Sequence, residues 1–234
     1  MALRGEAHRA AIRAVLDAFG ADARHFVFIG GCTLGLYARP DGAPLRATKD
    51  VDCISTLVPW VLQDKILADM CSRGVLSPDA DLQCRYRIRG TELDVDVLSP
   101  AGFNVGGVNP WFDRAAQRAR AYDVGEGRSV MALTPPYFLT TKLVAFADRG
   151  PDAQSSKDAE DIVTLLVEVP DLVDQVDAEG LRVEVTALWG RVLAKYSLRA
   201  SDLPDLVDWH LDSREASHRD AVIAALGALV GGSI

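Results

Sequence analysis

Apolar positions in the first half of the chain follow two different periods in turn. Spacings of three and four, as over residues 6–19, indicate amphipathic helices, and short apolar or alternating runs, as over 25–29, indicate strands. Turn-forming residues over 39–44 predict a loop. In chain order, the pattern predicts a helix over 6–19, a strand over 25–29, a helix over 32–38, a strand over 48–55, a helix over 58–73 and strands over 83–89 and 92–98. This order predicts a mixed sheet with helices packed on it.

The second half of the chain is almost wholly helical in its pattern. A glycine-rich stretch over 102–107 precedes a predicted helix and one further short strand. Helical spacing then predicts four helices, near 135–148, 156–167, 177–195 and 214–230. We therefore expect an α/β (α+β) fold, in which a mixed sheet flanked by helices over residues 1–130 is followed by a helical domain over 131–234.

Composition narrows the class of protein. The chain has 234 residues, of which 49% are hydrophobic and 25% charged, as in ordinary globular proteins. No apolar run approaches the roughly 20 residues of a membrane span, and the first residues lack the apolar core of a secretory signal. We expect a cytoplasmic protein without a membrane partner. The four cysteines form no CxxC pair and are expected to be buried thiols, although Cys32, beside two glycines, could instead be reactive.

The net charge of the chain limits which nucleic-acid partners can be expected. The net charge of −8 argues against nonspecific coating of nucleic acid, and no DNA partner is expected. A local basic patch is still compatible with this charge, because Arg85, Arg87 and Arg89 alternate in a predicted strand and would share one face. These arginines indicate either a solvated strand face or an RNA contact.

The segment Asp50-Val51-Asp52 carries the main chemical signal. Residues two apart in a strand point to the same side, so the two carboxylates converge. Like charges this close raise each other's pKa unless a cation lies between them, and Mg²⁺ favours carboxylate ligands. An Asp-x-Asp pair also occurs by chance at exposed strand edges, so the signal needs support from neighbouring elements.

Two further elements give that support. The strand 93–98 places Asp94 and Asp96 on one face, and either could supply a third carboxylate; Asp96 is preferred because apolar residues continue the strand beyond it. Before the Asp-x-Asp segment, an apolar strand runs into Gly30 and Gly31 and a helix start. Glycines let a backbone approach a phosphate closely, and a helix N-terminus offers free N–H groups. The three elements predict one pocket.

The glycine pair, the segment Thr48-Lys49-Asp50-Val51-Asp52 and the later Asp96 resemble the polymerase-β-type nucleotidyltransferase superfamily. That resemblance implies its fold and two-metal nucleotidyl transfer, in which an acceptor hydroxyl attacks the α-phosphate of an NTP and pyrophosphate leaves. The spacing from Gly31 to Asp50 is long for the superfamily, so residues 39–47 are expected to be a loop insertion beside the active site.

A narrower resemblance lies in the second half. Residues 133–145 with Lys142, then Arg149 and the segment 157–162 with its Lys-Asp-x-x-Asp sequence, resemble the AbiEii-like toxin nucleotidyltransferases. The match spans roughly residues 26–166. It implies that Lys142 and Asp158 complete the site, that Asp161 is a further candidate, that the acceptor is RNA, including a tRNA 3′ end, and that a protein antitoxin exists.

Together these signals predict a Mg²⁺-dependent nucleotidyltransferase with a two-ion site. The predicted catalytic residues are Asp50, Asp52, Asp96, Lys142 and Asp158, the predicted metal ligands are Asp50, Asp52 and Asp96, and the predicted nucleotide contacts are Gly30, Gly31, Thr33 and Lys49. A small-molecule acceptor of the aminoglycoside kind or a protein hydroxyl fits the same chemistry. An alternative of another class is a non-catalytic module of this fold that binds a nucleotide or a partner.

Overall fold

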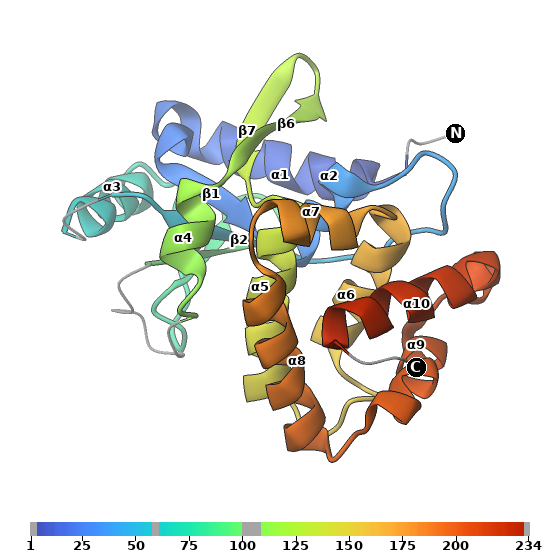
Figure 1. The fold of residues 1–234 in the computed structure, drawn as a ribbon. Coiled ribbons are helices and arrows are strands. Elements are labelled where there is room, and N and C mark those ends of the chain that lie inside the picture. Colours follow the sequence, from blue (N-terminus) through green and yellow to red (C-terminus); the bar gives the residue numbers. More distant parts are fainter. Residues whose placement is uncertain (1–3, 58–60, 100–108, 232–234) are drawn as a thin grey trace. The chain divides into compact units, whose positions relative to one another are not determined.

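The computed structural model describes residues 4–57, 61–99 and 109–231 (Figure 1). Backbone contacts divide the chain into two compact units. The sheet unit comprises residues 1–36 and 46–134, and the helical unit comprises 37–45 and 135–234. The division drawn after residue 130 from the sequence would cut a strand, whereas the contact-based division falls after Thr134 and gives residues 37–45 to the helical unit.

The sheet unit is built on a seven-stranded mixed sheet, which confirms the predicted α/β class. Its strands are β1 (Phe26–Ile29), β2 (Asp50–Ser55), β3 (Leu76–Pro78), β4 (Arg85–Ile88), β5 (Asp94–Leu98), β6 (Arg120–Gly125) and β7 (Arg128–Ala132). Its helices are α1 (Glu6–Phe19), α2 (Leu34–Tyr37, which ends at the unit boundary), α3 (Val61–Ser72) and α4 (Phe112–Gln117). The strand order is β3-β4-β5-β2-β1-β7-β6, with β2 parallel to β5 and antiparallel to β1.

The core of the sheet unit lies on one face of this sheet. Ile12 and Val15 of α1 and Leu67 of α3 belong to the same buried cluster as the strand residues Val51 and Cys53. Because side chains alternate along a strand, burying these two residues of β2 turns their neighbours to the opposite face. The hydrophobic effect on β2 therefore sets the orientation of its aspartates.

The sheet contains more strand than the sequence pattern predicts. The three-residue strand β3 is missing from the prediction, because three residues carry no readable alternation. The single short strand expected before residue 134 is wrong: β6 and β7 form a hairpin whose turn, Glu126-Gly127, has two positive φ angles, 57° and 70°. Much of β6 is exposed, so its sequence shows little of the apolar alternation by which a strand is recognised. The glycine-rich stretch predicted over 102–107 lies outside the described residues.

The helical unit contains α5 (Pro135–Asp148), α6 (Lys157–Glu168), α7 (Leu172–Ala178), α8 (Arg182–Tyr196), α9 (Leu203–His210) and α10 (Arg219–Val230). The helix predicted over 177–195 is confirmed as α8 from Arg182 onward, but its predicted start is too early, because the chain turns at Gly180, which has φ 67°. Helix α7 is missing from the prediction. Helix α9 is also missing from the prediction. Its Pro204 suggests a break between helices, but it lies in the first turn of α9, where proline is tolerated. No helix of the described ranges is long and apolar enough to cross a membrane.

Residues 37–45, which we call the strap, are held by two buried glutamates of the helical unit. The backbone N–H of Arg39 donates to Glu168 Oε2 (2.7 Å), and the N–H of Ala43 donates to Glu215 Oε1. His218 Nδ1 lies 3.0 Å from Glu215 Oε2. Because the strap is only a loop, its fixed backbone depends on these carboxylates rather than on secondary structure. The predicted loop is confirmed, while its expected place beside an active site stays a prediction.

Candidate functional site

Strands β2, β5 and β4 place acidic and basic residues in two rows across one face of the sheet. The residues that lie opposite one another are Asp52–Asp96–Arg85 in the first row and Asp50–Asp94–Arg87 in the second. Neighbouring strands lie about 4.8 Å apart, so side chains along a row are within reach of one another. The structure therefore brings together the carboxylates that the sequence predicted to share a pocket, and it places Asp96, rather than Asp94, next to Asp52.

The two arginines of β4 form paired hydrogen bonds with the aspartates of β5. Arg85 Nε and Nη2 donate to Asp96 Oδ1 and Oδ2, both at 2.8 Å. Arg87 donates through Nε and Nη2 to the two carboxylate oxygens of Asp94. The hydrogen bonds that Arg85 donates to Asp96 are the main reason that the pKa of Arg85 is raised above its usual value. These pairs were missed from the sequence, although an Arg-x-Arg strand joined by a tight turn to an Asp-x-Asp strand is a readable signal.

Gly30 makes room for the side chain of Asp52, a structural role that the sequence did not reveal. Its backbone, at φ 73° and ψ −175°, lies in a region that is open almost only to glycine. A Cβ at this position would lie 1.9 Å from Asp52 Oδ2, so the carboxylate is seated directly against the glycine backbone. The absence of a side chain at Gly30 makes room for Asp52; the predicted phosphate contact of Gly30 stays a prediction.

We expect Gly30→Ala to destabilise the sheet unit more than a matched alanine at another positive-φ glycine. The strained backbone alone should cost about 1–3 kcal/mol, and the added methyl group must also displace the Asp52 carboxylate. Gly127→Ala is the control, because Gly127 has φ 70° and open space where the methyl group would lie, and it should cost about 1–2 kcal/mol. Urea unfolding of both variants measures the difference. Equal losses would show that Asp52 is not held against Gly30.

The turn after Gly30 is closed by Thr33. The turn comprises Gly31–Thr33 in a short 3₁₀ helix, and both the backbone N–H and the hydroxyl of Thr33 donate to the Gly30 carbonyl, at 3.1 and 2.8 Å. Thr33 is fully buried. These contacts give Thr33 a local role in shaping the turn, and the nucleotide contacts predicted for Gly31 and Thr33 stay predictions.

The cysteines of the sheet unit differ in burial. Cys32 is fully buried and its thiol lies 3.2 Å from the Ile29 carbonyl, while burial raises the pKa of the Cys53 thiol well above its usual value. Because the Cys32 thiol is fully buried, a reagent cannot reach it, so the alternative of a reactive Cys32 finds no support. Cys71 and Cys84 are partly exposed, and burial also raises the pKa of each.

We expect a thiol reagent to distinguish these two pairs. In the native protein, Cys71 and Cys84 should react slowly, and Cys32 and Cys53 should react only after denaturation, because the reagent cannot reach buried sulfur. Counting modified thiols by mass spectrometry, with and without urea, measures this. Native labelling of Cys32 ahead of Cys71 would contradict this difference in burial.

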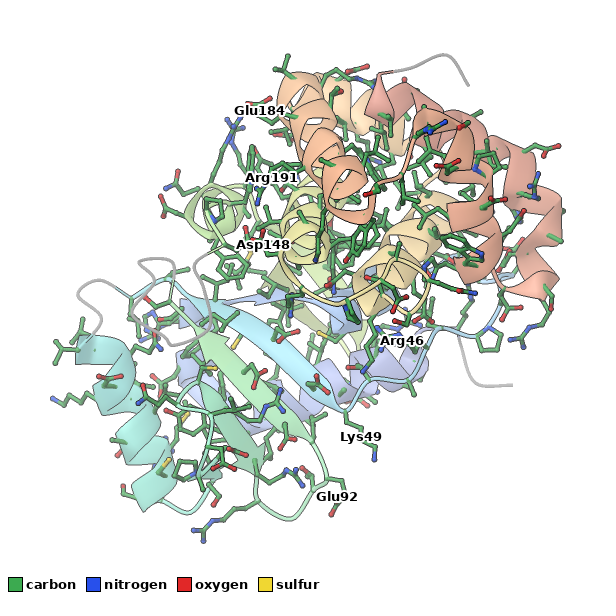
Figure 2. The ribbon with its side chains drawn as sticks, turned by 90° about the horizontal axis from the view of Figure 1, so that it is seen from below. Arg46, Lys49, Glu92, Asp148, Glu184 and Arg191 are labelled. Atoms are coloured by element: carbon green, nitrogen blue, oxygen red, sulfur yellow. The ribbon has the colours of Figure 1, made fainter. Side chains whose placement is uncertain are left out.

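Lys49 is exposed just before β2. Its carbonyl oxygen accepts a hydrogen bond from the N–H of Asp94 (3.0 Å), which extends the pairing of β2 with β5. Figure 2 shows its side chain projecting from the end of the strand, away from the sheet. A nucleotide contact by this side chain stays a prediction.

In the helical unit, Lys142 of α5 is enclosed by carboxylates of α6. Its Nζ lies 3.1 Å from Asp158 Oδ1 and 2.6 Å from Asp161 Oδ2. The side chains of Lys142 and Asp161 are only 14% and 3% exposed, so this is not an ordinary surface salt bridge. Asp158 also approaches Arg149, at 3.7 Å. The structure thus joins the lysine to the Lys-Asp-x-x-Asp segment that the sequence singled out, and their catalytic role stays a prediction.

The arginine face proposed for RNA is largely neutralised. Arg85 and Arg87 are each paired with an aspartate, and Glu92, which is labelled in Figure 2, lies 3.5 Å from Arg87. A guanidinium that already shares its hydrogen bonds with a carboxylate has less to offer a phosphate. Two of the three arginines predicted to form a basic patch therefore belong to a mixed-charge surface.

The carboxylate oxygens of Asp50, Asp52 and Asp96 fit one divalent cation better than two. Asp50 and Asp52 project from the same face of β2, with Asp52 fixed by Gly30, and their carboxylates are of the type that Mg²⁺ prefers. Asp96 fits a second ion poorly, because each of its oxygens already accepts a hydrogen bond from the permanently charged guanidinium of Arg85. Within residues 4–57, 61–99 and 109–231, no group of three or more His, Cys, Asp or Glu side chains is arranged to hold a metal ion.

Neither a protein-family model nor a curated protein sequence matches the chain. Among solved structures, it is similar to the crystal structure of an antigenic nucleotidyltransferase-like protein from Paracoccidioides brasiliensis. The two are 16% identical over 86% of this chain and 98% of that chain, with a TM-score of 0.47. At this similarity, function has to be inferred from the residues of the site themselves.

Proposed function

We propose that the protein is a Mg²⁺-dependent nucleotidyltransferase that moves a nucleoside monophosphate from an NTP to an acceptor hydroxyl. The observation that carries the proposal is the Asp50–Asp52 pair, which lies on the face of β2 opposite Val51 and Cys53, with Asp52 seated against Gly30. A carboxylate fixed against a glycine-only backbone is a preorganised ligand, because it loses little side-chain freedom when a cation binds.

In this proposal Asp50 and Asp52 hold the cation that accompanies the triphosphate. The bound Mg²⁺ would stabilise negative charge on the phosphate oxygens. Gly30 keeps the Asp52 carboxylate in place, Thr33 keeps the turn closed, and Arg85 holds Asp96 beside Asp52. Lys142 is proposed as a phosphate contact on the sequence resemblance alone, because its charge is already shared with Asp158 and Asp161.

The acceptor is the less constrained part of the proposal. RNA, and a toxin role with a protein antitoxin, rest on the sequence resemblance alone. The pairing of Arg85 and Arg87 with aspartates favours an acceptor that is not a polyanion, such as a small hydroxyl compound carrying amino groups. The carboxylates of these rows would attract a cationic acceptor and repel a nucleic-acid backbone.

The test is transfer from each α-³²P-labelled NTP, with Mg²⁺, to total RNA, to aminoglycosides and to protein acceptors. Transfer to an RNA should weaken steeply as salt rises, whereas transfer to a small molecule should change little. The competing idea, a non-catalytic module, predicts nucleotide binding without transfer to any acceptor. No transfer and no nucleotide binding would overturn the proposed function.

A further inference from the structure

Arg85 supplies positive charge to Asp96, the carboxylate that a second cation of the proposed site would need as a ligand. It lies directly opposite Asp96, which in turn lies directly opposite Asp52, so the guanidinium and the predicted third metal ligand share one row of the sheet. Both oxygens of Asp96 accept from Arg85 at 2.8 Å. The side chains of Arg85 and Asp96 are 27% and 15% exposed, which limits screening of the pair by water.

We infer that Arg85 is a built-in cation of the site: it takes the place of the second divalent ion, so that the chain binds one divalent ion through Asp50 and Asp52. This inference rests on the proposed function and replaces its expected two-ion site. Arg85 acts on the reaction through Asp96 and is therefore a positioning residue.

The balance of charge on this face agrees with one ion. The groups in the two rows are the carboxylates Asp50, Asp52, Asp94 and Asp96 and the guanidinium groups Arg85 and Arg87. Within the rows, four negative and two positive charges leave two negative charges, which equal the charge of one divalent cation; Glu92, beside Arg87, adds a further exposed carboxylate outside the rows. A second divalent ion would have to approach Asp96 beside a guanidinium that stays protonated, and like charges repel strongly at such distances.

The second row provides a matched control. Arg87 forms the same kind of pair with Asp94, but its side chain is 45% exposed and its row meets β2 at the exposed Asp50. Removing either arginine removes one positive charge from the same face. The partner of Arg85, Asp96, lies next to Asp52, whereas the partner of Arg87, Asp94, lies next to Asp50. Removing Arg85, but not Arg87, should therefore free a carboxylate beside Asp52.

The experiment counts bound Mn²⁺ by electron paramagnetic resonance on the full chain, saturated with the four non-hydrolysable α,β-methylene ribonucleoside triphosphates. Wild type should hold one ion with an uncoupled spectrum. Arg85→Gln should hold two ions with a spin-coupled spectrum, and Arg85→Gln with Asp96→Asn should return to one. Arg87→Gln should still bind one ion, because it leaves Asp96 paired with Arg85. Arg85→Lys should also bind one ion, because it keeps the positive charge beside Asp96.

The outcomes separate the inference from the proposed function. Two ions in wild type, or one ion in a folded Arg85→Gln variant, would overturn the role of Arg85 and leave nucleotidyl transfer standing. No bound ion in wild type would overturn the proposed site itself. Thermal melting establishes which variants are folded, and if Arg85→Gln does not fold, the wild-type count alone decides between one ion and two.

Discussion

Asp52→Asn should lower nucleotidyl transfer by about 100-fold or more, because loss even of an outer-shell partner of a metal site costs 10–100-fold. Asn has the size of Asp and can occupy the place against Gly30, but it lacks the negative charge that holds a cation. Initial rates of label transfer from the preferred NTP measure the effect, with melting curves to show that the fold is kept.

Glu92→Gln is the matched control for this loss. It removes one carboxylate near the same rows, from a side chain that is 96% exposed, and should leave the rate unchanged. Asp50→Asn should resemble Asp52→Asn in direction. Full activity of Asp52→Asn would show that the Asp-x-Asp segment is an ordinary strand edge and would sink the proposed site.

Lys142→Met should strongly destabilise the helical unit. It leaves Asp158 and Asp161 facing one another without the ammonium group between them, in a place where Asp161 is 3% exposed. Breaking a buried ion pair by removing one partner costs about 3–5 kcal/mol. Urea unfolding, compared with wild type at the same pH, measures the change in free energy.

A rescue variant tests the electrostatic reason for this loss. Lys142→Met combined with Asp158→Asn and Asp161→Asn removes the carboxylate charges that face Lys142 and should recover much of the stability. Lys157→Met is the control at a lysine that begins α6 outside this buried group, and it should change stability by no more than about 0.5 kcal/mol. A triple variant as unstable as Lys142→Met would mean that packing, rather than charge, dominates.

Secondary structure followed from the sequence wherever burial imposed a period. Helix α1 and strands β1, β2 and β5 were predicted within a few residues of their ends, because burial gives each of them a readable apolar pattern; in β1 all four residues are buried and form a continuous apolar run. The misses have local causes: β3 is too short to show a pattern, and much of β6 is exposed. The helix predicted from residue 177 begins only at Arg182, because Gly180 at positive φ interrupts the backbone, while the apolar spacing runs on through the turn.

The sequence by itself determined that Asp50 and Asp52 share a face, because strand alternation and the burial of Val51 and Cys53 leave no other arrangement. It also identified Lys142 and the segment with Asp158 as a related group. The register between strands was decided only by tertiary structure: it places Asp52, Asp96 and Arg85 in one row. Pairing across strands depends on residues far apart in sequence, so the arginine that neutralises the predicted third metal ligand became visible only once the sheet was assembled.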